Sequence, residues 1–287
     1  MNRCNGMAAS KRIERFRNDL IAAIPRFPND RVSQQVMQQK HITDVLITYV
    51  NWRIRFIGQR PRSASVCTDA KADPRWTGWE PQVRKLLTKV RAGDDLTPHL
   101  SLAPKTQGFT PASSAPGATP EERWSDKDQL LNVMGFHHLH LGDITAPLEH
   151  ADRTNELAFC HVTRNEFEVV AIFDHGVFER GTAERMRLLT LHEQRLTRGA
   201  PSGSAILMSA ITTAGTTIGG TMAAQSFVRL INAIDPMLDD PSRLSEIQSY
   251  GISVARPEKL KWMARHLDLG LYDKEEANFL MLQKGPT

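Results

Sequence analysis

Histidines are the side chains whose spacing in this sequence points most directly to chemistry. Five of the ten histidines fall between residues 137 and 161, and His175 follows closely. Alternate side chains of a strand share a face, so His138 and His140 would place two imidazoles about 7 Å apart on one surface. Imidazole titrates near neutral pH, and such a pair can take up one proton while it gives another. The alternative is that both histidines face solvent on an edge strand.

Arginines that could bind a phosphate lie before the second strand-like run and in the N-terminal region. Arg153 precedes residues 156–162, and its planar guanidinium can bind two phosphate oxygens. Arg53 and Arg55 alternate with apolar residues in the run 50–56, which predicts a half-buried strand with both arginines on its polar face. A helix continuing from Ile42 is the alternative interpretation.

Metal binding by the same region is a further alternative. The possible zinc ligands are His137, His138, His140, His150 and His161. The sequence fixes no third ligand by spacing, and it contains neither His-Glu-x-x-His nor a zinc-finger pattern. The Gly-x-Ser-x-Gly motif of serine hydrolases and the phosphate-binding loop are also absent from it. We expect a site without a cofactor, and a zinc- or manganese-dependent hydrolase remains the alternative.

Positive charge is concentrated near the N-terminus. The net charge is +4 overall, but residues 1–62 hold 12 basic and 4 acidic residues, a local net charge of +8. Such a segment can contact a phosphate backbone, since phosphate contacts supply most sequence-independent affinity for nucleic acids. A solvated helix explains the same pattern.

Cysteine usage indicates a reducing compartment. Cys4, Cys67 and Cys160 show no paired spacing, and the basic start of the chain lacks the apolar core of a secretory signal. The uncharged segment between Arg198 and Arg229 is diluted by glycine, serine and threonine, so it predicts no membrane span. We expect a cytoplasmic protein that does not associate with a membrane.

The elements that must position the histidines are three strand-like runs, residues 136–141, 156–162 and 167–175. Helical periodicity is expected over residues 10–24, 182–197 and 217–235, and again from near Pro257. The order of these elements predicts an α+β fold with a central antiparallel β-meander flanked by N- and C-terminal helices.

Composition suggests where the chain divides. Residues 101–124 are rich in Pro, Ser and Thr and predict a loop or linker. This stretch would separate a basic N-terminal α/β region, residues 1–100, from a histidine-rich sheet core with C-terminal helices, residues 125–287.

The segments RTNELAFCHV and FEVVAIFDHGVFE resemble the meander of bacterial RelE-type toxins, small endoribonucleases of the barnase-like class. The resemblance covers residues 126–180, and the run HHLH has no counterpart in those toxins. It implies metal-independent RNA cleavage, in which a base takes the ribose 2′-OH proton and a cation stabilises the phosphate. It assigns His138 and His140 to the acid–base pair, Arg153 to phosphate stabilisation and His175 to either role.

The leading hypothesis is therefore an endoribonuclease acting as a toxin or defence effector, with RNA as its substrate and an inhibitory protein as a further partner. Arg53 and Arg55 would assist substrate binding. Two other hypotheses stay open: the metal-dependent hydrolase, and a nucleic-acid-binding or structural protein in which the histidines only pack.

Overall fold

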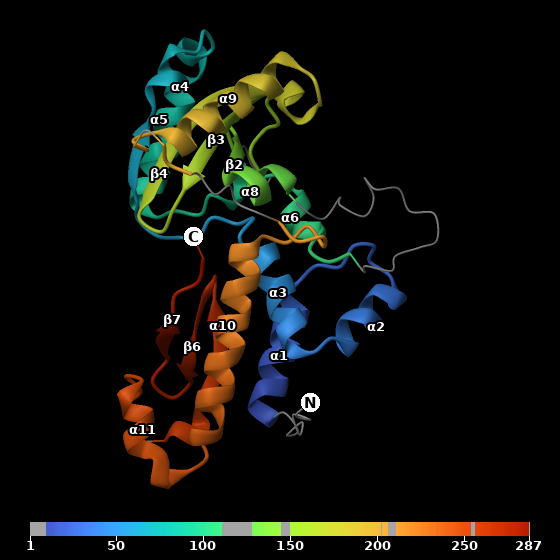
Figure 1. Cartoon of the computed structure of the whole chain (residues 1–287), viewed down its shortest axis with the longest axis vertical. Coiled ribbons are helices and arrows are strands. Elements are labelled where there is room, and N and C mark those ends of the chain that lie inside the picture. Colours follow the sequence, from blue (N-terminus) through green and yellow to red (C-terminus); the bar gives the residue numbers. More distant parts are fainter. Residues whose placement is uncertain are drawn as a thin grey trace. The chain divides into compact units, whose positions relative to one another are not determined.

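The computed structural model describes residues 10–110, 128–144, 150–201, 203–205, 211–253 and 256–286. The chain forms two compact units, whose elements are labelled in Figure 1. Unit 1 combines Met1–Ile54, Lys105–Lys127 and Ile218–Pro286, and unit 2 combines Arg55–Pro104 with Asp128–Thr217. Unit 1 is thus assembled from segments that precede, interrupt and follow unit 2 in the sequence. Of the predicted linker, residues 111–124 lie outside the described part of the chain.

Unit 1 combines N-terminal helices with a later helix and a small sheet. Its elements are α1 (Lys11–Ala23), α2 (Arg31–Gln39), α3 (Ile42–Arg53), α10 (Ile218–Ile234), the 3₁₀ turns η3 (Asp235–Met237) and η4 (Pro241–Arg243), α11 (Leu244–Ser249), η5 (Pro257–Lys259), β5 (Lys261–Arg265), β6 (Asp268–Asp273) and β7 (Asn278–Gln283). Helix α1 begins where the Ser10 side chain accepts a hydrogen bond from the Ile13 amide, and its apolar stripe buries Phe16 and Leu20. The helix predicted over residues 10–24 is confirmed.

The strand predicted over residues 50–56 is wrong. Helix α3 continues to Arg53, because Ile42, Val45, Leu46 and Tyr49 maintain a helical apolar spacing that outweighs the short alternation after Val50. All of these residues are buried. The alternative interpretation, a helix continuing from Ile42, is the observed one.

The helix expected from near Pro257 is also wrong. Strand β5 occupies residues 261–265 and lies at one edge of an antiparallel sheet of order β5-β6-β7. Trp262 is buried while its neighbours are exposed or half-buried, which is the alternation of a strand with one face packed. The C-terminal part therefore contains a sheet as well as helices.

Unit 2 is built around a four-stranded mixed sheet. Its elements are β1 (Ser63–Val66), α4 (Thr68–Ala72), α5 (Trp76–Ala92), η1 (Thr97–His99), α8 (Gln129–Met134), β2 (Phe136–His140), β3 (Glu156–Val162), β4 (Glu166–Asp174), η2 (His175–Phe178) and α9 (Ala183–Thr197); α6 (Ala103–Thr106) lies at the junction of the two units. The strand order is β1-β4-β3-β2, with β2–β3 and β3–β4 antiparallel and β1 parallel to β4. The molecule is α+β, as expected, and the sequence analysis did not predict β1.

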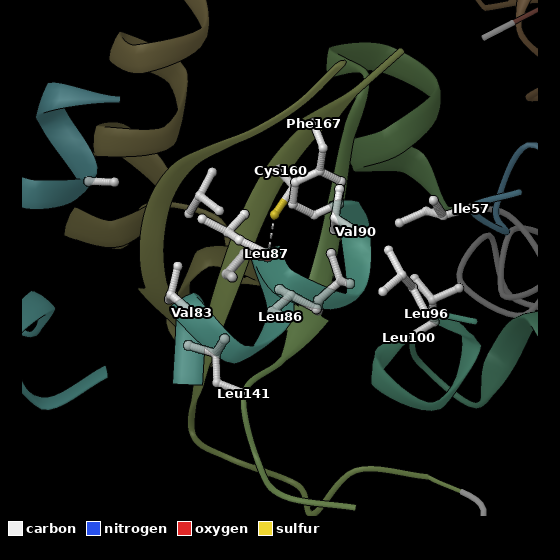
Figure 2. Close-up of a cluster of buried hydrophobic side chains, with 14 residues drawn as sticks. Ile57, Val83, Leu86, Leu87, Val90, Leu96, Leu100, Leu141, Cys160 and Phe167 are labelled. Atoms are coloured by element: carbon white, nitrogen blue, oxygen red, sulfur yellow. Dashed lines mark hydrogen bonds between the residues drawn. The ribbon is translucent and has the colours of Figure 1, made fainter. Parts of the chain in front are cut away.

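Helices cover both faces of this sheet. On one face α5 packs Val83, Leu87 and Val90 against Cys160 and Phe167, as Figure 2 shows. On the other face Phe136, Leu157, Phe159 and Phe173 pack against Leu130 and Met134 of α8, Val177 of η2 and Leu188 of α9. The turn that follows β4 lies beside β2 on this second face.

Candidate functional site

The histidines of strand β2 lie on both faces of the sheet. Phe136 packs in the core that includes α8 and α9, and Leu139 packs in the α5 core, so the predicted alternation of faces is confirmed. His138 and His140 therefore share the α8/α9 face. His137 lies on the other face, where burial lowers its pKa to about 4 and keeps the imidazole neutral.

His138 lies in an aromatic setting. Its ring stacks on Phe159 at a centroid distance of 5.9 Å and meets the edge of Phe178 at 5.1 Å. Its Nδ1 is 3.7 Å from a carboxylate oxygen of Asp128, the residue that caps α8. Burial lowers the pKa of His138, Asp128 opposes that shift, and electrostatic interaction with His175, Arg55 and Arg153 reinforces it.

His140 holds the guanidinium of Arg153. A terminal nitrogen of Arg153 contacts His140 Nε2, and a guanidinium can only donate, so Nε2 must accept. His140 is therefore the neutral tautomer with its proton on Nδ1. Burial is the main cause that lowers its pKa to about 4, and the charge of Arg153 acts in the same direction.

His175 brings a third imidazole to this face. It begins η2 directly after β4, and its ring lies 6.0 Å from that of His140. Its Nδ1 bonds to the carbonyl oxygen of Asn155 at 2.8 Å, so Nδ1 donates. His175 is exposed, whereas His140 is buried.

The four side chains predicted as catalytic thus lie close together. His138, His140, Arg153 and His175 come from β2, the segment before β3 and the start of η2, and we call these four residues the histidine cluster. The cluster combines one guanidinium with three imidazoles. Such a group can bind an anion and exchange protons with it.

Arg53 and Arg55 do not share a strand face. Arg53 ends α3 in unit 1, with its guanidinium 5.8 Å from the ring of Trp52. Arg55 belongs to unit 2, is only 5% exposed and is close enough to His138 to lower its pKa. The alternation that grouped the two arginines was misleading because the helix and the boundary between the units fall within that run.

Phe178 is a feature of the site that the sequence analysis missed. It is 42% exposed, although its ring lies 5.1 Å from His138 and 6.0 Å from His175. Its only sequence signal is a large apolar residue in the turn DHGVF, directly after a buried strand. An exposed aromatic ring beside imidazoles is a surface on which a planar group can stack.

Within the described residues, no three His, Cys, Asp or Glu side chains are grouped so that they could hold a metal ion. No described helix is long and apolar enough to cross a membrane.

Comparison with known proteins gives no relative. The chain matches no protein-family model, no curated protein and no solved structure.

Proposed function

We propose that unit 2 is a metal-independent endoribonuclease whose active site is the histidine cluster. The observation that carries the proposal is the placement of an arginine on a neutral histidine, with a second, solvent-exposed imidazole 6.0 Å away. A fixed cation beside proton-exchanging groups is what an RNA phosphodiester needs for attack by its own 2′-OH.

His175 is the general base in this proposal. Its Nδ1–H is engaged by Asn155, so the lone pair of Nε2 can take the proton of a ribose 2′-OH. The 2′-oxygen then bonds to phosphorus while the bond from phosphorus to the 5′-oxygen breaks. The products are a 2′,3′-cyclic phosphate and a 5′-hydroxyl end.

Arg153 stabilises the charge that develops on the phosphate, and His140 is its positioning residue. Because the guanidinium bonds to His140 through one terminal nitrogen, its remaining donors can reach phosphate oxygens. His140 is not the acid in this scheme, since the nitrogen that faces Arg153 carries no proton.

His138 supplies the proton for the leaving 5′-oxygen. Burial and neighbouring cations lower its pKa in the ligand-free protein. The negative charge of a bound phosphate raises the pKa of His138, so it opposes the effects of burial and of the cations. Asp128 already acts in the same direction. Substrate therefore favours the protonated form that the reaction needs.

The test is cleavage of RNA by purified protein in EDTA, with analysis of the fragment ends. We expect cyclic phosphate ends from the wild type and a loss of about 10²-fold or more in rate for His175→Ala and for Arg153→Ala. His150→Ala is a matched control, because His150 lies outside the histidine cluster and its hydrogen bond within the described residues is to the adjacent Ala151 carbonyl.

Two outcomes would contradict the proposal. Activity that is absent in EDTA and restored by zinc or manganese would favour the metal-dependent hydrolase. Cleavage that is equally strong in all variants would place the active site elsewhere.

If the enzyme acts inside a cell, unrestrained RNA cleavage would be harmful. The proposal therefore includes an inhibitory protein partner of a toxin or defence effector.

A further inference from the structure

A second feature with the chemistry of a binding site is a large open groove in unit 1. It has a volume of about 1080 Å³ and lies between α1, the turn at residues 24–29, α2 and Lys105. The side chains that give it its character are Arg17, Arg26, Lys105, Asn29, Gln34 and Gln38, and no carboxylate lines it. The proposed active site does not use any of these residues.

Two of the three cations in the groove have no ion-pair partner among the carboxylates of the described residues. Within that part of the chain, the guanidinium of Arg26 bonds to the amide oxygen of Asn29, at 3.2 and 3.0 Å. Lys105 is exposed, and none of the described carboxylates pairs with it. Both charges are therefore available to an anion.

Asp30 is the acidic side chain nearest to Arg26 in the chain, and it is committed elsewhere. Its Oδ1 accepts a hydrogen bond from the Ser33 amide at 2.7 Å, where it caps α2. The pKa of Asp30 is lowered chiefly by its hydrogen bonds with Ser33, and Arg26 is the weakest contributor.

Arg17 forms the wall of the groove. Its Nε donates to the Lys40 carbonyl at 2.8 Å and a terminal nitrogen donates to the Gln38 carbonyl, so it holds the C-terminal end of α2. Glu14 lies 3.6 Å away, with a half-exposed side chain. Arg17 therefore stabilises the wall of the groove and adds positive electrostatic potential to it. Arg26 and Lys105 are the cations that can contact a ligand directly.

From this arrangement we infer that the groove binds the sugar–phosphate backbone of single-stranded RNA. The identification of the polymer as RNA rests on the proposed function, whereas the preference for a polyanion rests on the groove itself. A volume of about 1080 Å³ exceeds what one phosphate or carboxylate needs. Lining amides can donate to sugar and phosphate oxygens, and separated cations match charges repeated along a chain.

The experiment measures binding of a fluorescent 20-nucleotide 2′-O-methyl oligoribonucleotide by anisotropy at several salt concentrations. This probe has no 2′-OH and cannot be cleaved, so its binding does not depend on the proposed activity. The test variant is Arg26→Gln with Lys105→Gln. We expect its affinity to fall by about 10-fold and its salt slope to shrink by about 1.4, since each single-strand phosphate contact contributes about 0.7.

A matched control removes two positive charges from unit 1 outside the groove. Arg229→Gln with Lys284→Gln changes two exposed residues, on α10 and after β7, and should change affinity by less than about 2-fold. Circular dichroism of both variants checks that they fold. The groove variant keeps every residue of the histidine cluster, so it should cleave a dinucleotide at the wild-type rate.

Three results would overturn the inference: no binding of the probe by the wild type, equal losses in the groove and control variants, or displacement of the probe by polyglutamate as effectively as by unlabelled oligonucleotide. The last result would assign the groove to an acidic protein. Binding with no RNA cleavage would leave the groove assignment intact and reject the endoribonuclease.

Discussion

At the scale of single residues, the contact between His140 and Arg153 makes a specific prediction. His140→Gln retains a side-chain acceptor for the guanidinium, whereas His140→Ala removes it. We expect kcat/KM for RNA to fall by less than about 10-fold in the first variant and by about 10²-fold in the second, because Arg153 loses its orientation.

The pH profile separates this positioning role from acid–base catalysis. If His140 only positions Arg153, the His140→Gln variant keeps the two limbs of the wild-type profile, which the proposed mechanism assigns to its general acid and its general base. Loss of one limb would instead make His140 the acid or the base.

Two buried neutral histidines predict acid sensitivity. The pKa values of His137 and His140 are lowered from 6.5 to about 4 in the folded chain, so unfolding takes up protons between these values. The stabilisation from these two neutral imidazoles should therefore be complete above pH 6.5. The free energy of unfolding should fall as the pH drops toward 4, by at most about 1.4 kcal/mol per pH unit for each histidine.

Denaturant unfolding at pH 6.5, 6.0, 5.5 and 5.0 measures this effect, because carboxylates stay ionised over most of that range. His137→Gln should flatten the slope, by at most about 1.4 kcal/mol per pH unit. An unchanged slope in His137→Gln would show that the histidine is protonated or accessible in the folded chain.

What could be predicted at this scale was side-chain direction. Strand alternation alone places His138 and His140 on one face, and the structure agrees. Which nitrogen of His140 faces Arg153 depends on where Arg153 lies before β3, which no local pattern encodes. Phe178 was missed because a phenylalanine after a buried strand is expected in the core, whereas this one is 42% exposed.

At the scale of elements, the end of α5 gives a sharp test of backbone geometry. Gly93 follows α5 with φ of +80°, and a Cβ there would lie 2.7 Å from the ring and backbone nitrogen of Pro61. Gly181 has the same φ, but a Cβ there would meet nothing within 4 Å.

Both alanine substitutions incur the left-handed backbone penalty of about 1 kcal/mol, and only Gly93→Ala adds a collision with backbone. We expect Gly93→Ala to be more destabilising than Gly181→Ala by about 1–3 kcal/mol in chemical denaturation. Equal losses would mean that the Pro61 segment moves aside without cost.

Element type was predictable where one periodicity dominated. Strands β2, β3 and β4 begin and end within one residue of their predicted limits. Residues 50–56 and 257–263 failed because each presents a short apolar pattern that fits two periods, and packing decided between them. The alternation at 50–56 is the end of a longer helical stripe, and that at 261–265 is completed by pairing with β6.

At the scale of the whole molecule, unit 1 depends on contacts between residues far apart in the sequence. Asp235 is 2% exposed and accepts hydrogen bonds from Arg12 at 3.1 Å and from Trp262 at 2.7 Å. It thereby links α1, η3 and β5. Arg12 also pairs with Asp239, whose side chain is 60% exposed.

Asp235→Ala should lower the free energy of unfolding by about 2–4 kcal/mol, because it leaves the buried indole N–H of Trp262 without its acceptor and removes one of the two carboxylates that pair with the largely buried guanidinium of Arg12. Asp239→Ala should cost at most about 1 kcal/mol. Urea titration of both variants compares them. Similar small losses would show that water replaces Asp235 readily.

The division into units was not accessible from local composition. A boundary can be placed at a Pro- and Ser-rich stretch, but the return of residues 218–286 to the unit that begins with α1 requires knowledge of long-range packing. Helix α10 packs on α3, and β5 packs on α1, across about 200 residues of sequence.

This route of the chain has a consequence for synthesis on the ribosome. Every segment of unit 2 has been translated once residue 217 is added, so its sheet can close before unit 1 is complete. Helices α1 and α3 are translated before unit 2, but their partners α10 and β5 are translated after it, so residues buried in α1 and α3 stay incompletely covered in the meantime. The N-terminal helices of unit 1 are therefore the part most in need of chaperone protection until residues 218–265 have been added.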